Sequence, residues 1–155
     1  MIKETPSLPH AAPCPRPLRS GDTGRVMISL IQAARAVEKR IEEALERVDL
    51  SRPKYSALKQ LVLADGPLAL SELADRLTCV RSNITQLVDR LEADGLVRRV
   101  EDPRDRRSVR AALTPLGKER QAAGAERIQE VECEVEKILS QIDRETLERA
   151  LAALQ

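Results

Sequence analysis

Apolar residues recur at alternating steps of three and four over a long stretch near each end of the chain. Near the N-terminus the series is Met27, Leu30, Ala34, Val37, Ile41, Ala44 and Val48. Near the C-terminus it is Ile128, Val131, Val135, Ile138 and Ile142. This spacing places the side chains on one stripe of a helix, so it predicts a long helix at 23–48 and further helices over 115–155. Both stripes are longer than a small lobe can cover, which indicates a partner.

The composition is that of a soluble globular domain without an aromatic core. The chain has 155 residues, of which 33% are charged and 42% belong to the hydrophobic set. That length supports one domain. Tyr55 is the one aromatic residue, so the core must be built from Leu, Val, Ile and Ala. The scarcity argues against base-stacking platforms, aromatic cages and carbohydrate sites. We see no apolar run long enough for a membrane span.

Histidine and cysteine usage argues against an enzyme and against a metal site. His10 is the single histidine, and it lies in the segment 1–22, which holds five of the nine prolines and is predicted to be a flexible arm. We therefore expect no Ser-His-Asp or Cys-His catalysis, no metal and no cofactor. Cys14, Cys79 and Cys133 form no CxxC pair, and no secretory signal is visible, so we expect a cytoplasmic protein.

The segment 54–114 alternates short helical and extended patterns with turn residues. Pro53 can open a helix at its first turn. The predicted buried face of that helix is Tyr55, Leu58, Leu61 and Val62. Residues 68–70 fit a short strand, and Ser71 is a good N-cap for a helix that ends at Leu77.

A tight turn at 78–80 joins that short helix to a second one at 81–93, which together form a helix-turn-helix. The face of the second helix that must point to the core is Ile84, Leu87, Val88 and Leu91. The exposed face of its first half is Ser82, Asn83, Thr85 and Gln86. Asn and Gln side chains suit adenine, and Arg81 can reach a phosphate or a guanine. An ordinary solvated helix face has a similar composition, so this face alone does not identify a DNA-binding helix.

A basic hairpin comes directly after Gly95, a predicted left-handed helix terminator. Residues 98–110 contain six arginines and three acids, with a polar tip predicted at 101–108. Such a tip can lie along DNA and insert an arginine into the minor groove. Asp102 and Asp105 would orient the arginines through charge-assisted hydrogen bonds. The alternative is a soluble turn with surface ion pairs of small value. Thr114 then caps the next helix.

Four segments together resemble the MarR family of winged-helix transcription regulators. They are SELADRL at 71–77, ITQLVDRLEADGLVRR at 84–99, DPRDRRS at 102–108 and LTPLG at 113–117. The Asp-Arg-Arg segment followed by Leu-Thr-x-x-Gly is the most specific of them. The resemblance covers the chain from about residue 23 to its C-terminus. It implies a mainly α fold with a small β-hairpin.

The resemblance also implies an obligate homodimer that binds a palindromic operator in double-stranded DNA. The dimerisation helices would be 23–48 and 115–155, and the DNA-binding lobe 54–114. The implied DNA-binding residues are Arg81, Ser82, Asn83, Thr85, Gln86, Arg90, Arg104, Arg106 and Arg107. Either Arg106 or Arg107 would enter the minor groove, and the other would pair with Asp105.

Family members commonly respond to a small ligand or to an oxidant. Arg35, Lys39 and Tyr55 are the candidate lining of a ligand crevice, although Tyr55 fits core packing equally well. Cys79 is expected to be buried, and acidic neighbours around Cys133 disfavour a thiolate.

These expectations define a dimeric repressor that a small-molecule effector or an oxidant releases. The alternative is a dimeric winged-helix module that binds a protein partner and no specific DNA.

Overall fold

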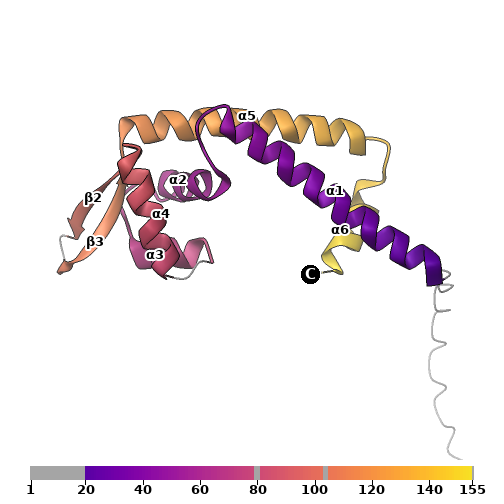
Figure 1. Ribbon diagram of the computed structural model, residues 1–155, viewed down its shortest axis with the longest axis horizontal. Helices are drawn as coiled ribbons and strands as arrows, with labels where there is room; N and C mark the ends of the chain where they lie inside the picture. The colour runs from indigo at the N-terminus through magenta and orange to yellow at the C-terminus, as the bar shows by residue number, and fades with distance from the viewer. Residues whose placement is uncertain (1–19, 79–80, 103–104, 155) are drawn as a thin grey trace, which may run out of the picture. The chain divides into compact units, whose positions relative to one another are not determined.

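The computed structural model describes residues 20–78, 81–102 and 105–154, and it divides into two units at residues 35 and 36. Most described residues are helical, and three strands form one small antiparallel sheet (Figure 1). The expected mainly α fold with a small β-hairpin is confirmed. The elements are α1 Ser20–Glu46, α2 Arg52–Leu63, β1 Leu68–Ala69, α3 Leu70–Arg76, α4 Arg81–Ala93, β2 Val97–Asp102, β3 Asp105–Leu113, α5 Pro115–Leu139 and α6 Arg144–Ala152.

The first unit comprises the first part of α1, which carries apolar side chains in solvent. Between 39% and 59% of the surface of each is exposed. These residues are Val26, Met27, Ile28, Leu30 and Ile31. The predicted helix at 23–48 is therefore present, but this part of its apolar stripe is not covered by the chain's own core.

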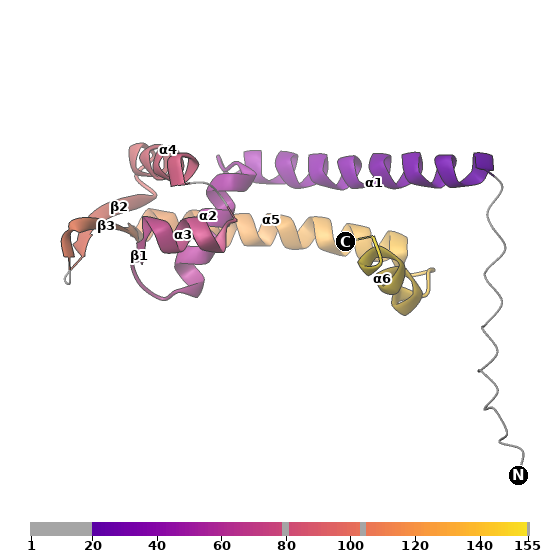
Figure 2. The ribbon, with the colours of Figure 1, turned by 90° about the horizontal axis from the view of Figure 1, so that it is seen from below.

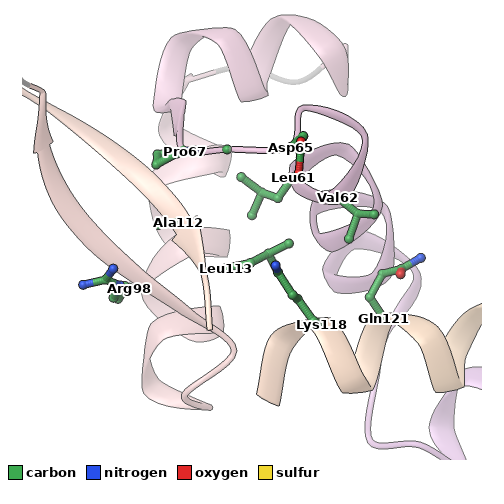
Figure 3. A pocket seen from close by; sticks show the side chains of 10 residues that line it. Leu61, Val62, Asp65, Pro67, Arg98, Ala112, Leu113, Lys118 and Gln121 are labelled. Carbon is green, nitrogen blue, oxygen red and sulfur yellow. The ribbon is translucent and has the colours of Figure 1, made fainter. Parts of the chain in front are cut away.

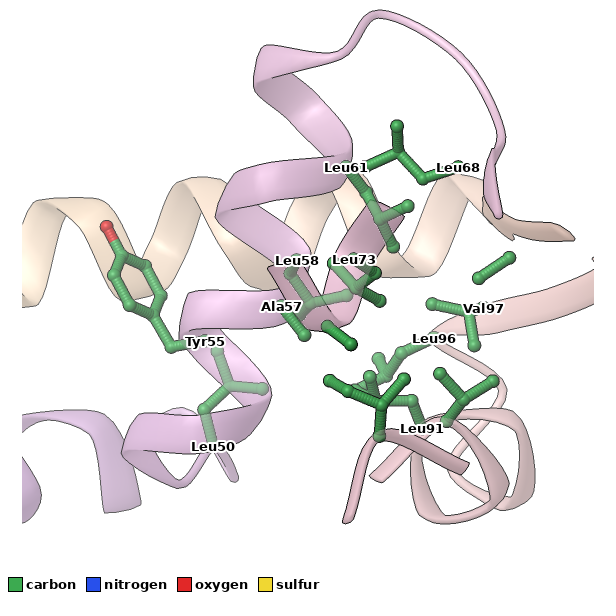
Figure 4. Packing of buried hydrophobic residues seen from close by; sticks show 14 of the residues in the cluster. Leu50, Tyr55, Ala57, Leu58, Leu61, Leu68, Leu73, Leu91, Leu96 and Val97 are labelled. Carbon is green, nitrogen blue, oxygen red and sulfur yellow. The ribbon is translucent and has the colours of Figure 1, made fainter. Parts of the chain in front are cut away.

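The second unit has an aliphatic core at the junction of α2, α3, α4 and the β2–β3 hairpin (Figure 4). Its largest fully buried side chains are Leu45, Leu58, Leu61, Leu73, Ile84, Val88, Leu91 and Val97. Complete burial of one such side chain contributes roughly 1.5–3 kcal/mol. Tyr55 lies at the edge of this cluster, where α2 meets α5 (Figure 4). The core thus has the aliphatic character that the composition predicts.

Helix α2 has Pro53 in its first turn, as predicted, and Ser51 is its N-cap. Its buried residues include Tyr55, Leu58 and Leu61, but the prediction for Val62 is wrong, because 40% of Val62 is exposed. Val62 follows Leu61 by 100° around the helix, which carries it past the edge of the buried stripe. Ala57, four residues before Leu61, is buried instead.

Helix α3 begins earlier than the sequence predicts. Its N-cap is Ala69 and not Ser71, which lies inside the first turn. The cause is Glu72, whose carboxylate accepts a hydrogen bond of 2.9 Å from the backbone N–H of Ala69 and so holds the helix start. The strand predicted at 68–70 is correspondingly shortened to Leu68–Ala69, since Leu70 already belongs to the helix.

The sheet has the order β1–β3–β2, with both pairings antiparallel. The strands of the β2–β3 hairpin are longer than predicted, because most of the polar segment 101–108 belongs to them. Their register shifts between Glu101 and Asp102, and Asp102 pairs with Asp105 beyond that shift. The predicted left-handed residue before the hairpin is confirmed, with Gly95 at a φ of 71°.

The long helix α5 begins at the predicted cap. The Thr114 hydroxyl accepts a hydrogen bond of 3.0 Å from the N–H of Gly117 and donates one of 2.7 Å to the carbonyl oxygen of Gly95. Thr114 therefore also ties α5 to the start of the hairpin. Helix α6 has Asp143 as its N-cap, whose carboxylate accepts a hydrogen bond from the N–H of Thr146 at 3.3 Å.

Candidate nucleic-acid interface

Helix α4 has a buried apolar face and an exposed polar face. Ile84, Val88 and Leu91 are buried in the core, and Leu87 is half-buried. The exposed residues of the first half are Ser82, Asn83, Thr85 and Gln86. This is the division that the helical spacing predicts. The preceding helix α3 packs against α4.

The other predicted DNA-binding residues lie partly outside the described residues. Arg90 is exposed on α4. Arg104 and the side chains of Arg81, Asp105, Arg106 and Arg107 are not among those that the structure describes. The backbone of β3 begins at Asp105, so Arg106 and Arg107 belong to the first residues of that strand.

An arginine that the sequence reasoning did not single out joins the hairpin to α4. The guanidinium of Arg99 on β2 donates to Asp89, with 2.5 Å between Nη2 and Oδ1, and through Nη1 to Oε2 of Glu92. The backbone N–H of Arg99 also donates to Oε1 of Glu92 at 2.9 Å. These bonds fix β2 beside α4, an adjacency visible in both ribbon views (Figures 1 and 2).

These contacts stabilise the charged forms of both partners. Hydrogen bonds from the backbone and side chain of Arg99 hold the pKa of the Glu92 carboxyl below its ordinary value. The hydrogen bond to Asp89, followed by that to Glu92, raises the pKa of the Arg99 guanidinium.

A second arginine, Arg110 on β3, holds the opposite face of the hairpin. Its Nε donates to Oδ2 of Asp102 at 2.6 Å, and its Nη1 donates to the carbonyl oxygen of Pro67 at 3.1 Å. The Glu72 carboxylate lies 4.0 Å from the same Nη1. Asp102 is only 7% exposed, although a solvated tip was expected there. Asp102 therefore contacts Arg110 at the tip end of β2, and this bond raises the pKa of the Arg110 guanidinium.

Arg99 and Arg110 of the segment 98–110 are thus engaged by acids of the same lobe. Asp89 and Glu92 lie three residues apart on one helix, and Arg99 follows them on the strand after the chain turns at Gly95. That spacing is the signal that could have identified the first ion-pair group. The second depends on the register shift in the hairpin, for which the sequence shows no marker.

Tyr55, one of the candidate ligand-crevice residues, packs as a core residue. It is 8% exposed, and a Cβ added to Gly124 of α5 would come within 2.8 Å of its Cδ2 atom. Burial raises the pKa of the Tyr55 hydroxyl, and its hydrogen bond with Gln121 partly offsets this. Lys39 lies 3.6 Å from the Glu43 carboxylate. Arg35 belongs to the first unit.

A cavity of about 490 Å³ lies where α2, the hairpin base and α5 meet (Figure 3). Its apolar lining comes from Leu61, Val62, Pro67, Ala112 and Leu113. Its charged lining is Arg98, Lys118 and Asp65. Arg98 and Lys118 are exposed, and no ion pair joins either of them to an acid among the described residues. None of the three expected crevice residues lines this cavity.

Cys133 is exposed on α5, whereas Cys14 and Cys79 lie outside the described residues. Within the described residues, no three His, Cys, Asp or Glu side chains are grouped so that they could hold a metal ion. No helix in the described part of the chain is long and apolar enough to cross a membrane.

A helix-turn-helix followed by an antiparallel hairpin is the winged helix-turn-helix fold. The model of the MarR family matches residues 50–109. The uncharacterised HTH-type transcriptional regulator YkoM of Bacillus subtilis is 40% identical over 67 residues, which cover 43% of this chain and 44% of YkoM. The transcriptional regulator BldR from Sulfolobus solfataricus is 30% identical, with a TM-score of 0.63 over 88% of this chain and 97% of that chain.

The transcriptional repressor CouR, solved bound to a 23-mer DNA duplex, is 27% identical with a TM-score of 0.74. That likeness covers 88% of this chain and 97% of the CouR chain. The chain belongs to the MarR family. It spans about half the length of the curated relatives it matches.

Proposed function

We propose that this chain is a dimeric, sequence-specific DNA-binding transcription regulator that represses by occluding its operator. The observation that carries the proposal is the exposed polar face of α4. The opposite face of this helix packs in the hydrophobic core, and a basic hairpin follows the helix in the chain. The likeness to a repressor solved with a DNA duplex supports it.

The exposed half of α4 has the chemistry for reading base edges in the major groove. Ser82, Asn83, Thr85 and Gln86 are short groups that donate and accept hydrogen bonds. An amide such as that of Gln86 suits adenine, whereas hydroxyls contact any base. We assign Arg90, which is exposed further along the helix, to a contact with the DNA backbone. Phosphate contacts supply position and affinity, and base contacts supply specificity.

The hairpin is assigned to the adjacent minor groove. Arg104, Arg106 and Arg107 are the proposed contacts, because arginine is attracted into narrow minor grooves. Since Arg99 and Arg110 are engaged within the lobe, we assign the DNA contacts of the hairpin to the arginines nearer its tip.

The exposed apolar residues of both units support a homodimer. In the first unit they are clustered at residues 26–31. In the second unit the exposed apolar residues nearest the C-terminus are Ile138, Leu139, Ile142, Leu151 and Leu154. Contiguous apolar surface of this kind marks an interaction site. A two-fold dimer would place its two α4 helices about one DNA turn apart on a palindrome.

We assign the release of DNA to a small effector that enters the cavity between α2, the hairpin base and α5. Its apolar lining fits the body of an amphipathic anion. The two cations Arg98 and Lys118 outnumber the one carboxylate of the lining, Asp65, and so favour a negative charge on the effector. The cavity lies where the hairpin joins α5, so an occupant would alter the position of the lobe relative to that helix. Addition of aliphatic and aromatic carboxylates to the protein–DNA complex tests this assignment, because an effector must weaken DNA binding.

Selection of bound duplexes from a random pool tests the main proposal. We expect enrichment of a palindrome whose half-sites lie about one helical turn apart, with affinity that falls steeply as salt rises. Failure to enrich any sequence, together with capture of a protein partner by the same surface, would support the interaction module instead.

A further inference from the structure

We propose that Arg99 is a positioning residue that locks the hairpin to α4 and thereby sets how sharply the protein discriminates between duplex sequences. This inference rests on the proposed function, because it concerns how the two DNA-contacting elements are held together. It assigns Arg99 no contact with DNA.

Arg99 joins the two elements through its backbone as well as its side chain. The backbone N–H of Arg99 donates to Glu92 and so fixes the position of strand β2. The guanidinium donates to Asp89 and Glu92 and so fixes the angle between β2 and helix α4. A planar guanidinium bound to two carboxylates tolerates little rotation. The Arg99 side chain is 28% exposed, whereas those of Asp89 and Glu92 are 56% and 38% exposed. Solvent therefore screens the charges, and the attachment depends on the geometry of the hydrogen bonds more than on Coulomb energy.

The anchor points lie close to the surfaces that they would align. Asp89 is three residues after Gln86, so the two share one side of α4. Arg99 lies three residues before Asp102, the last residue of β2 before the tip. A pivot at Arg99 would therefore change the position of the hairpin tip relative to the base-reading side chains.

The hairpin has an independent attachment on its other face. Arg99 is paired with Ala111 in the ladder, so Arg110 points to the opposite side, where it binds Asp102 and Pro67. Loss of Arg99 should therefore loosen the angle between hairpin and α4 without unfolding the lobe.

Such loosening should act on discrimination more than on affinity. Non-specific binding depends on phosphate contacts, which do not require a fixed angle between the hairpin and α4. Specific binding requires α4 and the hairpin to fit adjacent grooves at once, and added freedom must then be lost on binding. A direct phosphate contact would behave differently, because its removal lowers the slope of log affinity against log salt by about one.

The first experiment measures amide hydrogen exchange of the full-length protein without DNA, comparing Arg99→Met with Lys54→Met. Lys54 is the matched control because its ammonium, 2.5 Å from Asp94, pairs with a residue just after α4 but does not contact the hairpin. We expect exchange in β2 and β3 to quicken by about tenfold in Arg99→Met alone, as loss of a coupled ion-pair network would produce. Unchanged exchange in β2 and β3 would overturn the proposal.

The second experiment compares the affinities of both variants for the selected palindrome and for a scrambled duplex, over a range of salt. For Arg99→Met we expect the ratio of the two affinities to fall by about tenfold while the salt slope stays that of the parent. Arg99→Lys keeps the charge but not the planar fork, so its ratio should be intermediate. A salt slope reduced by about one with an unchanged ratio would make Arg99 a phosphate contact and overturn the proposal.

The two experiments separate this inference from the proposed function. A parent protein that does not discriminate between duplexes contradicts the proposed function, and with it the role of Arg99 in discrimination. The exchange measurement then still decides whether Arg99 locks the hairpin to α4. Thermal unfolding of each variant verifies that the comparison is made between folded proteins.

Discussion

Gly117 occupies a site where the first turn of α5 lies directly against the backbone of the residue that precedes β2. A Cβ added there would lie 2.0 Å from the carbonyl oxygen of Leu96 and 3.0 Å from Cδ2 of Leu113. The first of these distances is far below van der Waals contact with an atom that cannot rotate away. The contact therefore permits glycine and excludes every larger residue.

We predict that Gly117→Ala lowers the free energy of unfolding by about 3 kcal/mol or more, because relief of the clash must shift α5 or the backbone at Leu96. Urea unfolding followed by circular dichroism measures the change. Gly24→Ala is the control, since no atom lies within 4 Å of the Cβ added at Gly24. It should match or slightly exceed the parent. Equal stability of the Gly117 variant and the parent would contradict this packing.

Glu92 makes the attachment of the hairpin sensitive to acid. Its pKa is lower in the folded protein than its ordinary value of 4.5, because Arg99 binds its charged form. The carboxylate therefore contributes stability that is present above about pH 4.5 and is lost as the pH falls through the folded pKa. We predict that the urea midpoint of the parent falls on acidification, and that Glu92→Gln has a lower midpoint at neutral pH and a flatter pH profile. Parallel profiles for the two proteins would contradict the assignment.

The arginines show where single-residue reasoning succeeds and where it stops. The number of arginines in 98–110 predicts a basic hairpin, but their sequence does not say which are engaged by acids of the lobe. That depends on strand register and on the shift between Glu101 and Asp102. The register and its shift are both set by the pairing of two polar segments, and polar segments of similar composition do not show in their sequence which residues will pair.

At the scale of elements, α4 has the bounds that the sequence predicts. Its apolar spacing is imposed by a core that buries Ile84, Val88 and Leu91, so the pattern is strong. The start of α3 and the length of the hairpin were not predictable in the same way. The first depends on the Glu72 carboxylate, and the second on cross-strand pairing of polar residues.

For α4 we predict that Gln86→Ala changes the preferred duplex sequence and leaves the affinity for unrelated DNA nearly unchanged. The reason is that an amide reading a base edge contributes about 1–3 kcal/mol of discrimination and little to phosphate binding. Repeating the duplex selection with the variant measures the change. Arg107→Ala is the contrasting variant, which should weaken binding to all duplexes. An unaltered preference in Gln86→Ala would remove Gln86 from the reading surface.

At the scale of the whole molecule, the exposed apolar residues at both ends of the chain are the surface assigned to the proposed dimer. We predict that Met27→Lys combined with Ile31→Lys converts the dimer to a monomer of 17.2 kDa, because both positions lie on one exposed apolar stripe of α1. Sedimentation equilibrium measures the mass.

Gln32→Lys adds one charge at an exposed polar position of α1 and is the control, which should keep the mass of a dimer. A parent protein that sediments as a monomer would contradict the dimer outright.

The most direct measurement is the affinity of the parent for the selected palindrome compared with a scrambled duplex of the same length and composition, by fluorescence anisotropy at physiological salt. We predict that the palindrome binds at least about a thousandfold more tightly, with two protomers per duplex. Equal affinity for the two duplexes would contradict sequence-specific binding by this chain.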